Sequence, residues 1–142
     1  MTAYATQQDL VDRFGNDAFL AAADRDRDGV ADAAAVQGAL DDASAMMDAA
    51  FSKRYDLPLP TTPRWAARIC ADLAMGLLVP SESATDLVLA RFKAADKFMQ
   101  SIASGDIGLG LPPAAVPQTG EVGDVKGEIL GDGPLRQFRR SC

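Results

Sequence analysis

Apolar residues in the first hundred positions recur at steps of three and four, which is the spacing of amphipathic helices. The clearest run predicts a long helix from about Ala33 to Arg54, and another predicts a helix that ends before Gly105. The apolar faces consist of Val36, Leu40, Ala43, Met47 and Ala50 or Phe51 in the first helix, and of Val88, Phe92, Ala95, Met99 and Ile102 in the second.

Capping residues indicate where the short first helix and the last helix begin. Thr6 and Asp9 have the spacing of a capping box, in which hydroxyl and carboxylate bond to free backbone amides, and Gly15 is expected to end this helix. Residues 17 to 22 are expected to form one or two further turns. Ser83 and Asp86 repeat the capping-box spacing, so we expect the last helix to begin there.

A further helix is expected between the prolines at 63 and 80. The two prolines within residues 55 to 60 favour an extended connection before it. Thr62 as N-cap and Pro63 at the first helical position predict its start, and Pro80 marks its end. Its predicted apolar face consists of Trp65, Ile69, Leu73 and Leu77, with Cys70 beside them as a small buried side chain.

Glycine and proline are concentrated near the end of the chain. Eight of the 12 glycines lie in the last 38 residues, a density of helix breakers that no compact helical core tolerates. We therefore predict an all-α fold, in which residues 1–104 form a small bundle of three main helices plus a short N-terminal helix. Residues 105–142 are expected to form a long extended tail, with a short hairpin as a weaker prediction for 123–130.

An acidic loop precedes the long helix at 33. Four of its oxygen-bearing residues match positions 1, 3, 5 and 9 of an EF-hand calcium loop, with glycine at position 6, and these are Asp24, Asp26, Asp28 and Asp32. Position 12 is Ala35, so the bidentate carboxylate of a strong calcium site is missing. Two interpretations stay open: a weak metal site, or a turn whose acids pair with arginines and whose last acid caps the next helix.

Asp72 stands in an otherwise apolar helical segment, where an unpaired carboxylate is costly to bury. We expect it to pair with Arg54 or Arg68, or to accept a hydrogen bond from Tyr55. A catalytic pairing with Asp48 is the alternative, because two carboxylates can act as general acid and general base.

Composition excludes several classes of function. The chain of 142 residues has no histidine, which removes the commonest general base and transition-metal ligand, so we expect neither an enzyme nor a cofactor. Its 14 Lys and Arg against 20 Asp and Glu give a net charge of −6, which argues against binding of duplex nucleic acid. Cys70 and Cys142 have no neighbouring ligand residues for zinc. No apolar run reaches the length of a signal peptide or membrane span, so synthesis in the cytoplasm without membrane association is expected.

Several short segments follow one another in a distinctive order and spacing. They are Tyr4 to Leu10, Arg13 to Gly15, the acidic loop, Ala39 to Ala43 with Asp48, Arg54 to Leu59, Cys70 to Ala74, and Ile102 to Gly105 with Leu109. Together they resemble the Mu-like phage neck family of small helical proteins. The chain departs from that family at Met75 and Gly76, where many relatives carry arginine and tyrosine.

The resemblance implies a structural virion protein at the head-tail neck of a tailed phage or prophage. Such a connector, or adaptor, is expected to form a ring, commonly of twelve copies, between the portal protein and a stopper or tail-terminator protein. Packaged DNA would pass through the ring without sequence-specific binding, because an acidic lumen repels it. The candidate channel-facing acids are those of the acidic loop or Asp41, Asp42 and Asp48. A calcium-regulated binding module and a small enzyme are the alternative classes.

The final segment combines apolar and cationic side chains. Leu135 and Phe138 stand among Arg136, Arg139 and Arg140, whereas residues 1–104 carry 15 acids and 10 bases. Apolar anchors beside guanidinium groups suit an acidic groove on another protein. We therefore expect residues 134 to 142 to hold the ring on its portal.

Overall fold

The computed structural model describes residues 3–115 of the chain. These residues form five helices and no strand, which confirms the all-α prediction. In chain order the helices are α1 (Gln7–Phe14), α2 (Asn16–Ala23), α3 (Ala33–Phe51), α4 (Ala66–Leu78) and α5 (Asp86–Ser104). Most of the tail, including the hairpin expected at 123–130, lies outside the described residues.

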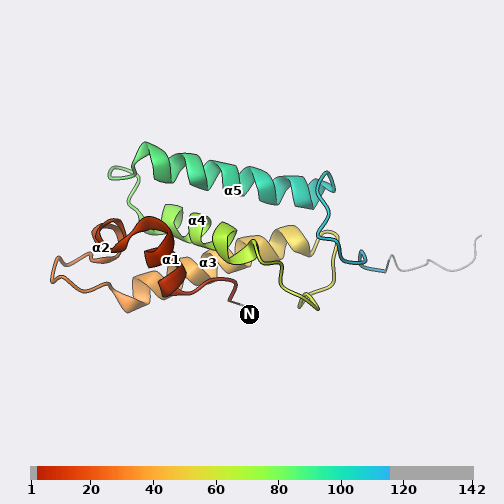
Figure 1. Cartoon of the computed structure of the whole chain (residues 1–142), viewed down its shortest axis with the longest axis horizontal. Coiled ribbons are helices and arrows are strands. Elements are labelled where there is room, and N and C mark those ends of the chain that lie inside the picture. The colour runs from red at the N-terminus through yellow and green to blue at the C-terminus, as the bar shows by residue number, and fades with distance from the viewer. Residues whose placement is uncertain (1–2, 116–142) are drawn as a thin grey trace, which may run out of the picture.

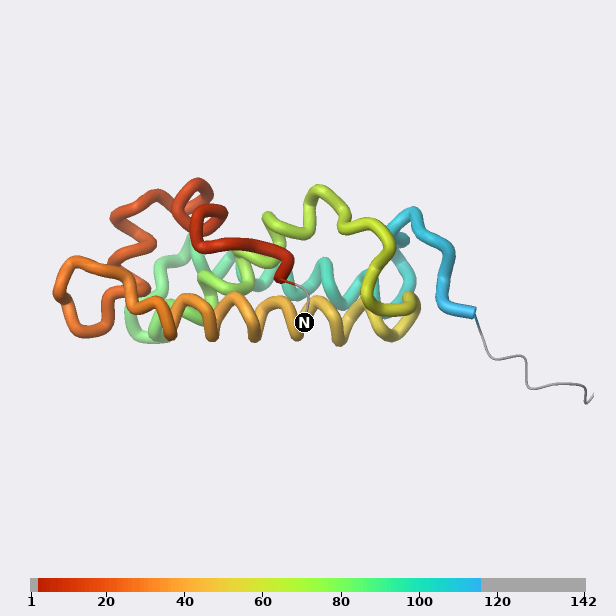
Figure 2. Tube along the Cα trace, turned by 90° about the horizontal axis from the view of Figure 1, so that it is seen from below, coloured from red at the N-terminus to blue at the C-terminus, as the bar shows by residue number. Residues whose placement is uncertain are grey.

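The three longer helices lie along the long axis of the molecule. α3 and α5 run in the same direction, and α4 runs back between them (Figure 1). The two short helices pack against α4 and α3 near the beginning of α3. As a result, the acidic loop projects at one end of the molecule and residues 105–115 lie at the other (Figure 2).

The core is centred on α4, which contacts each of the other four helices. Nine of its 13 residues are buried, so this helix is apolar around most of its circumference, as expected for a central element. A row of edge-to-face aromatic contacts extends from the N-terminus to α5, with ring centroids 5.8, 6.2 and 4.9 Å apart along Tyr4, Phe51, Trp65 and Phe98.

The predicted beginning of α1 and the predicted end of α5 are confirmed. The amide of Thr6 donates to the carboxylate of Asp9 at 2.7 Å while the Asp9 amide donates to the Thr6 hydroxyl, which is the reciprocal capping box. Gly105 ends α5 with a φ of 94°, in the left-handed region that favours glycine. A side chain at this position would be strained by the positive φ and would also displace the end of the Arg54 side chain.

The predicted beginnings of α4 and α5 are wrong. α4 begins at Ala66, because the Pro63 carbonyl accepts a hydrogen bond from the Ala66 amide at 2.9 Å and closes a separate turn before the helix. α5 is capped by Thr85, whose hydroxyl accepts from the Val88 amide. Ser83 instead closes a turn by donating its amide to the Pro80 carbonyl at 2.8 Å.

Two smaller corrections concern helix faces and lengths. Leu77 was expected in the core but is 40% exposed, and Leu78 takes the buried position. All four other helices contact α4, so its buried residues do not follow a single stripe. α3 ends at Phe51 rather than Arg54, and residues 52 to 54 form a turn.

Candidate functional site

The acidic loop brings together three carboxylates. One oxygen from each of Asp24, Asp26 and Asp28 lies within 4.8 Å of the others. Both oxygens of Asp24 accept hydrogen bonds from loop amides, at 3.1 Å from Asp28 and 2.8 Å from Gly29, and Asp28 accepts one from Val30 at 2.8 Å. These acids therefore stabilise the backbone conformation of the turn.

Two acids of the loop have pKa values shifted in opposite directions. Desolvation opposes the ionisation of Asp24, but hydrogen bonds from the Gly29 and Asp28 amides outweigh it and lower its pKa. At Asp26 the Asp28 amide favours ionisation, but desolvation and the carboxylate of Asp28 outweigh it and raise the pKa. Acids of the same loop thus differ in how readily they ionise.

Two predictions for this loop are wrong: the cap by Asp32 and the pairing of its acids with arginines. Asp32 occupies the N-cap position of α3, but its carboxylate accepts a hydrogen bond from the Arg25 amide at 3.1 Å and does not cap the helix. In the described part of the chain, neither Arg25 nor Arg27 forms an ion pair with the loop acids. Backbone amides, rather than arginines, stabilise the turn.

The three candidate acids on α3 differ in their surroundings. Asp41 and Asp42 are exposed, and Asp41 accepts a hydrogen bond from Gln37 at 2.8 Å. Asp48 is half-buried and accepts a hydrogen bond from the Tyr4 hydroxyl at 2.5 Å. Burial, followed by this contact with an acid, raises the pKa of Tyr4 far above its ordinary value. Only the first two acids therefore project freely into solvent.

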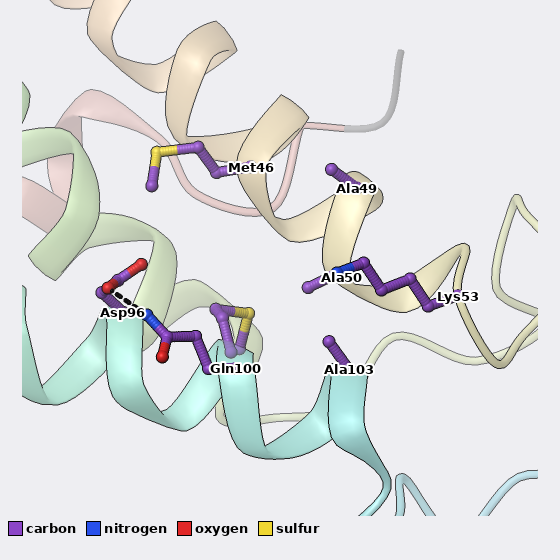
Figure 3. A pocket seen from close by; sticks show the side chains of 8 residues that line it. Met46, Ala49, Ala50, Lys53, Asp96, Gln100 and Ala103 are labelled. Atoms are coloured by element: carbon purple, nitrogen blue, oxygen red, sulfur yellow. Dashed lines mark hydrogen bonds between the residues drawn. The ribbon is translucent and has the colours of Figure 1, made fainter.

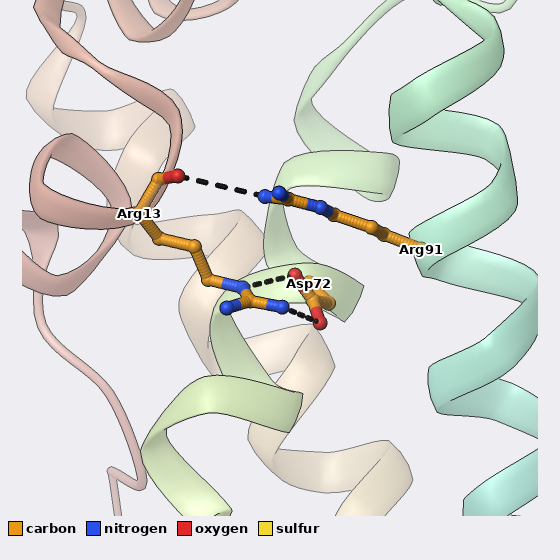
Figure 4. Close-up of polar contacts among 3 residues, drawn as sticks. All are labelled: Arg13, Asp72 and Arg91. Atoms are coloured by element: carbon orange, nitrogen blue, oxygen red, sulfur yellow. Dashed lines mark hydrogen bonds and ion pairs between the residues drawn. The ribbon is translucent and has the colours of Figure 1, made fainter.

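Asp72 pairs with a residue that the sequence did not indicate. Its two carboxylate oxygens accept hydrogen bonds from the Arg13 guanidinium at 2.5 and 2.7 Å (Figure 4). Arg91 of α5 donates to the Arg13 carbonyl oxygen at 3.5 Å and lies over the ring of Phe14. The expected partners Arg54, Arg68 and Tyr55 make no such bond. Asp48, the alternative partner, accepts from Tyr4 instead.

Residues from the segments that carry the family resemblance contact one another across the fold. Besides Arg13 with Asp72 and Tyr4 with Asp48, the Tyr55 hydroxyl accepts a hydrogen bond from the Leu109 amide at 2.9 Å. Arg13 and Asp72 are 59 residues apart in sequence. Their occurrence within two of these segments was the one signal that could have linked them.

A shallow groove lies between the C-terminal halves of α3 and α5 (Figure 3). Its volume is about 250 Å³, and its walls are mostly methionine and alanine side chains. Lys53, in the turn after α3, and Asp96 on α5 add charge at its edges, and Gln100 donates a hydrogen bond to Asp96 at 2.7 Å. The other residues that line it are Met46, Ala49, Ala50, Met99 and Ala103.

The predicted portal-binding residues Leu135, Arg136, Phe138, Arg139 and Arg140 lie outside the described residues. Cys70 is buried, as expected, and burial raises the pKa of its thiol. None of the helices in residues 3–115 is long and apolar enough to cross a membrane.

These features define a small all-helical protein. Arg13, Asp72 and Tyr55 contact other parts of its own fold. The acidic loop, the exposed acids Asp41 and Asp42 and the groove lie on its surface. The sequence matches the family described as Bacteriophage Mu, Gp36 over residues 4–126, and the chain belongs to this family. It is therefore a protein of Mu-like phages.

A curated relative gives the same indication. The Mu-like prophage FluMu protein gp36 of Haemophilus influenzae is 40% identical over 80 residues. The alignment covers 56% of this chain and 56% of the relative, so the chain spans about half of that protein's length.

Proposed function

We propose that this chain is a structural virion protein, the head-tail connector of a Mu-like phage. Copies would form a ring, twelve in number by the resemblance, between the portal protein and a stopper or tail-terminator protein. The observation that carries the proposal is the family match over residues 4–126, which includes the segments that resemble phage neck proteins. We propose no catalytic role and no cofactor for it.

The acidic loop is our candidate for the surface that faces DNA. It projects from one end of the molecule, and its carboxylates have no paired cation among residues 3–115 (Figure 2). The loop has four acids against Arg25 and Arg27, and this excess of negative charge repels the phosphate backbone, which suits a channel through which DNA slides. Asp41 and Asp42 are the second candidate, whereas Asp48 is held by Tyr4.

The tail is our candidate for attachment to the portal. The described chain ends at residue 115, where the Ala114 amide donates to the Arg54 carbonyl at 2.8 Å, at the end of the molecule opposite the acidic loop. A further 27 residues follow, enough to reach an adjacent protein when extended. Loop and tail would thus act at different ends of one subunit.

Electron microscopy of the purified protein mixed with portal rings tests the proposal. We expect an added ring layer on the portal, with the acidic loop toward the lumen. Deletion of residues 134–142 should leave the helical circular dichroism spectrum unchanged and remove the layer. Absence of the layer with the full chain would contradict the connector role.

Matched substitutions test which tail residues matter. Replacing Leu135 and Phe138 by alanine removes the two apolar anchors and should prevent binding to the portal. Replacing Gln137 and Ser141 by alanine is the control and should leave binding intact. Equal binding by both variants and by the truncated chain would refute attachment through this segment.

A further inference from the structure

The groove between α3 and α5 lies at the end of the molecule where the tail begins. Lys53 lines it beside Arg54, whose carbonyl accepts a hydrogen bond from the Ala114 amide at 2.8 Å. Ala103, which lines the other wall, stands two residues before Gly105, where α5 ends (Figure 3). The last described residues of the chain therefore lie next to this end of the groove, which we call its mouth.

The beginning of the tail binds the subunit to which it belongs. Leu109 and Leu111 are partly buried against the hydrophobic core, and the Leu109 amide donates to the Tyr55 hydroxyl at 2.9 Å. The bond from Ala114 to the chain after α3 follows a few residues later. The tail thus stays on its own fold up to the mouth of the groove.

The sequence after residue 115 has the signals of a chain that turns back. Pro117 and Gly120 are turn residues, because proline presets φ for a turn and glycine permits a positive φ. A reversal centred between them would bring residue 121 level with residue 116, close to the mouth of the groove. The family match continues to residue 126, so the returning segment is part of it.

Two valines in this segment have a spacing that fits the groove. Met46 and Lys53 line the α3 wall seven residues apart, which corresponds to about 10 Å of helix. In a polyproline II conformation, which needs no backbone partner, residues three apart share one edge and are about 9 Å from each other. Val122 and Val125 would then face the walls together, while the charged residues of 121–126 lie on the other two edges.

We propose that residues 121–126 occupy the groove of their own subunit, with Val122 and Val125 against its methionine and alanine side chains. Burial of apolar surface on both partners supplies the attraction. The short connection from Ala114 holds the segment at an effective concentration of about millimolar, so a small contact suffices. The inference goes beyond the connector role and does not depend on it, since residues 127–142 still extend up to about 50 Å from the groove.

A disulfide measures how often the segment lies in the groove. The full chain receives Ala49→Cys in the groove and Val122→Cys in the tail, with Cys142→Ser to remove the terminal thiol, while Cys70 stays buried. In glutathione buffer we expect a disulfide within one chain, at an effective concentration at least about tenfold above that of the control pair. The control has Asp56→Cys in place of Ala49→Cys, because Asp56 is exposed at the same end of the molecule but outside the groove.

The identity of the linked chains decides between occupants. Mass spectrometry of the digested protein shows which cysteines are joined and whether they belong to one chain. Equal effective concentrations for the two pairs would overturn the inference. A disulfide between position 49 of one chain and position 122 of another would assign the groove to the tail of a neighbouring copy, and would also overturn it.

Protection of a groove thiol tests the two valines. Ala49→Cys alone, in the same background, reacts with a maleimide, and adding Val122→Asp/Val125→Asp should raise its rate at least about fivefold, because aspartate is costly to bury against apolar walls. The control Ile129→Asp/Leu130→Asp adds the same charge beyond the segment and should leave the rate within about twofold. An unchanged rate in the first variant, or an equal increase in both, would refute the contact.

The protection should not depend on protein concentration. Since both partners belong to one chain, the rate for Ala49→Cys should be the same from about 10 μM to about 500 μM protein. Protection that grows with concentration would assign the groove to a second molecule and overturn the inference. Circular dichroism of each variant verifies that it is folded.

This contact and the connector role can fail separately. A ring layer on the portal, together with no preference of the cysteine at 122 for the one at 49, would overturn the inference and leave the connector role intact. Formation of the expected disulfide by a chain that adds no layer to the portal would contradict the connector role alone.

Discussion

The ion pair between Arg13 and Asp72 allows a demanding test of the fold. It links α1 to the central helix through two hydrogen bonds of 2.5 and 2.7 Å. The side chain of Asp72 is 6% exposed and that of Arg13 is 26% exposed. Removing either side chain leaves the other without its partner, but water can reach the arginine more easily than the aspartate.

The two single substitutions should therefore differ in cost. Loss of one partner of a buried pair typically lowers the free energy of unfolding by about 3–5 kcal/mol. We expect Arg13→Leu to lie in that range, because it strands a buried carboxylate. Asp72→Leu should cost less, about 2–3 kcal/mol, because the partly exposed guanidinium is still hydrated.

The double substitution separates the pair from its surroundings. Arg13→Leu/Asp72→Leu leaves no unpaired charge, so it should cost less than Arg13→Leu alone, with a coupling of at least about 2 kcal/mol. Urea unfolding followed by circular dichroism measures each free energy of unfolding, and an unchanged denaturant slope verifies two-state behaviour.

Arg68→Leu is the matched control. Arg68 is an exposed arginine on α4 that the sequence suggested as the partner of Asp72, and its loss should change the free energy of unfolding by no more than about 0.5 kcal/mol. Costs for Arg13→Leu no larger than those for Arg68→Leu, or strict additivity in the double variant, would refute the assignment of this pair.

Three further predictions concern other parts of the molecule. Gly76→Ala should lower the free energy of unfolding by about 1–3 kcal/mol in urea, because a Cβ there would overlap the ring of Phe92, whereas Gly38→Ala meets open space and should raise it by up to about 1 kcal/mol. Tyr4→Phe should cost about 1–2 kcal/mol at pH 8 by removing a hydrogen bond to α3. Because folding raises the pKa of Tyr4, its contribution is present below the ordinary tyrosine pKa of about 10 and is lost as the pH rises further, so this cost should shrink in alkaline urea titrations. Calorimetric titration of the acidic loop with calcium should show no heat at about millimolar metal, since backbone amides already occupy several of its carboxylate oxygens and no acid stands at the twelfth position.

Each of these has a clear contrary result. Equal effects of the two glycine substitutions would mean that α4 and α5 do not approach closely at Gly76. A pH-independent cost of Tyr4→Phe would contradict the raised pKa. Calcium binding that disappears in Asp24→Asn, but not in Asp17→Asn on α2, would establish a metal site in the loop.

The sequence predicts a helix boundary correctly where a few adjacent residues alone determine it. The box of Thr6 and Asp9 and the glycine at 105 act through bonds within one helical turn, and both were identified correctly. The cap at Ser83 failed because Pro80 recruits its amide into a turn, which a pattern of hydroxyl and carboxylate spacing does not reveal.

Long-range polar pairing was beyond reach of the sequence. The helix periodicity placed Asp72 correctly in an apolar segment, and burial did require a partner. Which arginine lies opposite depends on how α1 crosses α4, and arginines nearer in sequence were equally plausible. The same applies to Asp48, whose spacing suggested an exposed acid but which the N-terminal segment covers through Tyr4.

The sequence by itself thus determined the helical class, the order and approximate bounds of the helices, and the family resemblance, because all three follow from local spacing and residue identity. Only the tertiary structure decided which charges neutralise one another and which stay free. Arg13 pairs with Asp72 inside the fold, whereas Asp41 and Asp42 of α3 are exposed and form no ion pair with any described residue. The physical reason is that the energy of an ion pair depends on distance and burial in three dimensions, and the packing of the helices sets both.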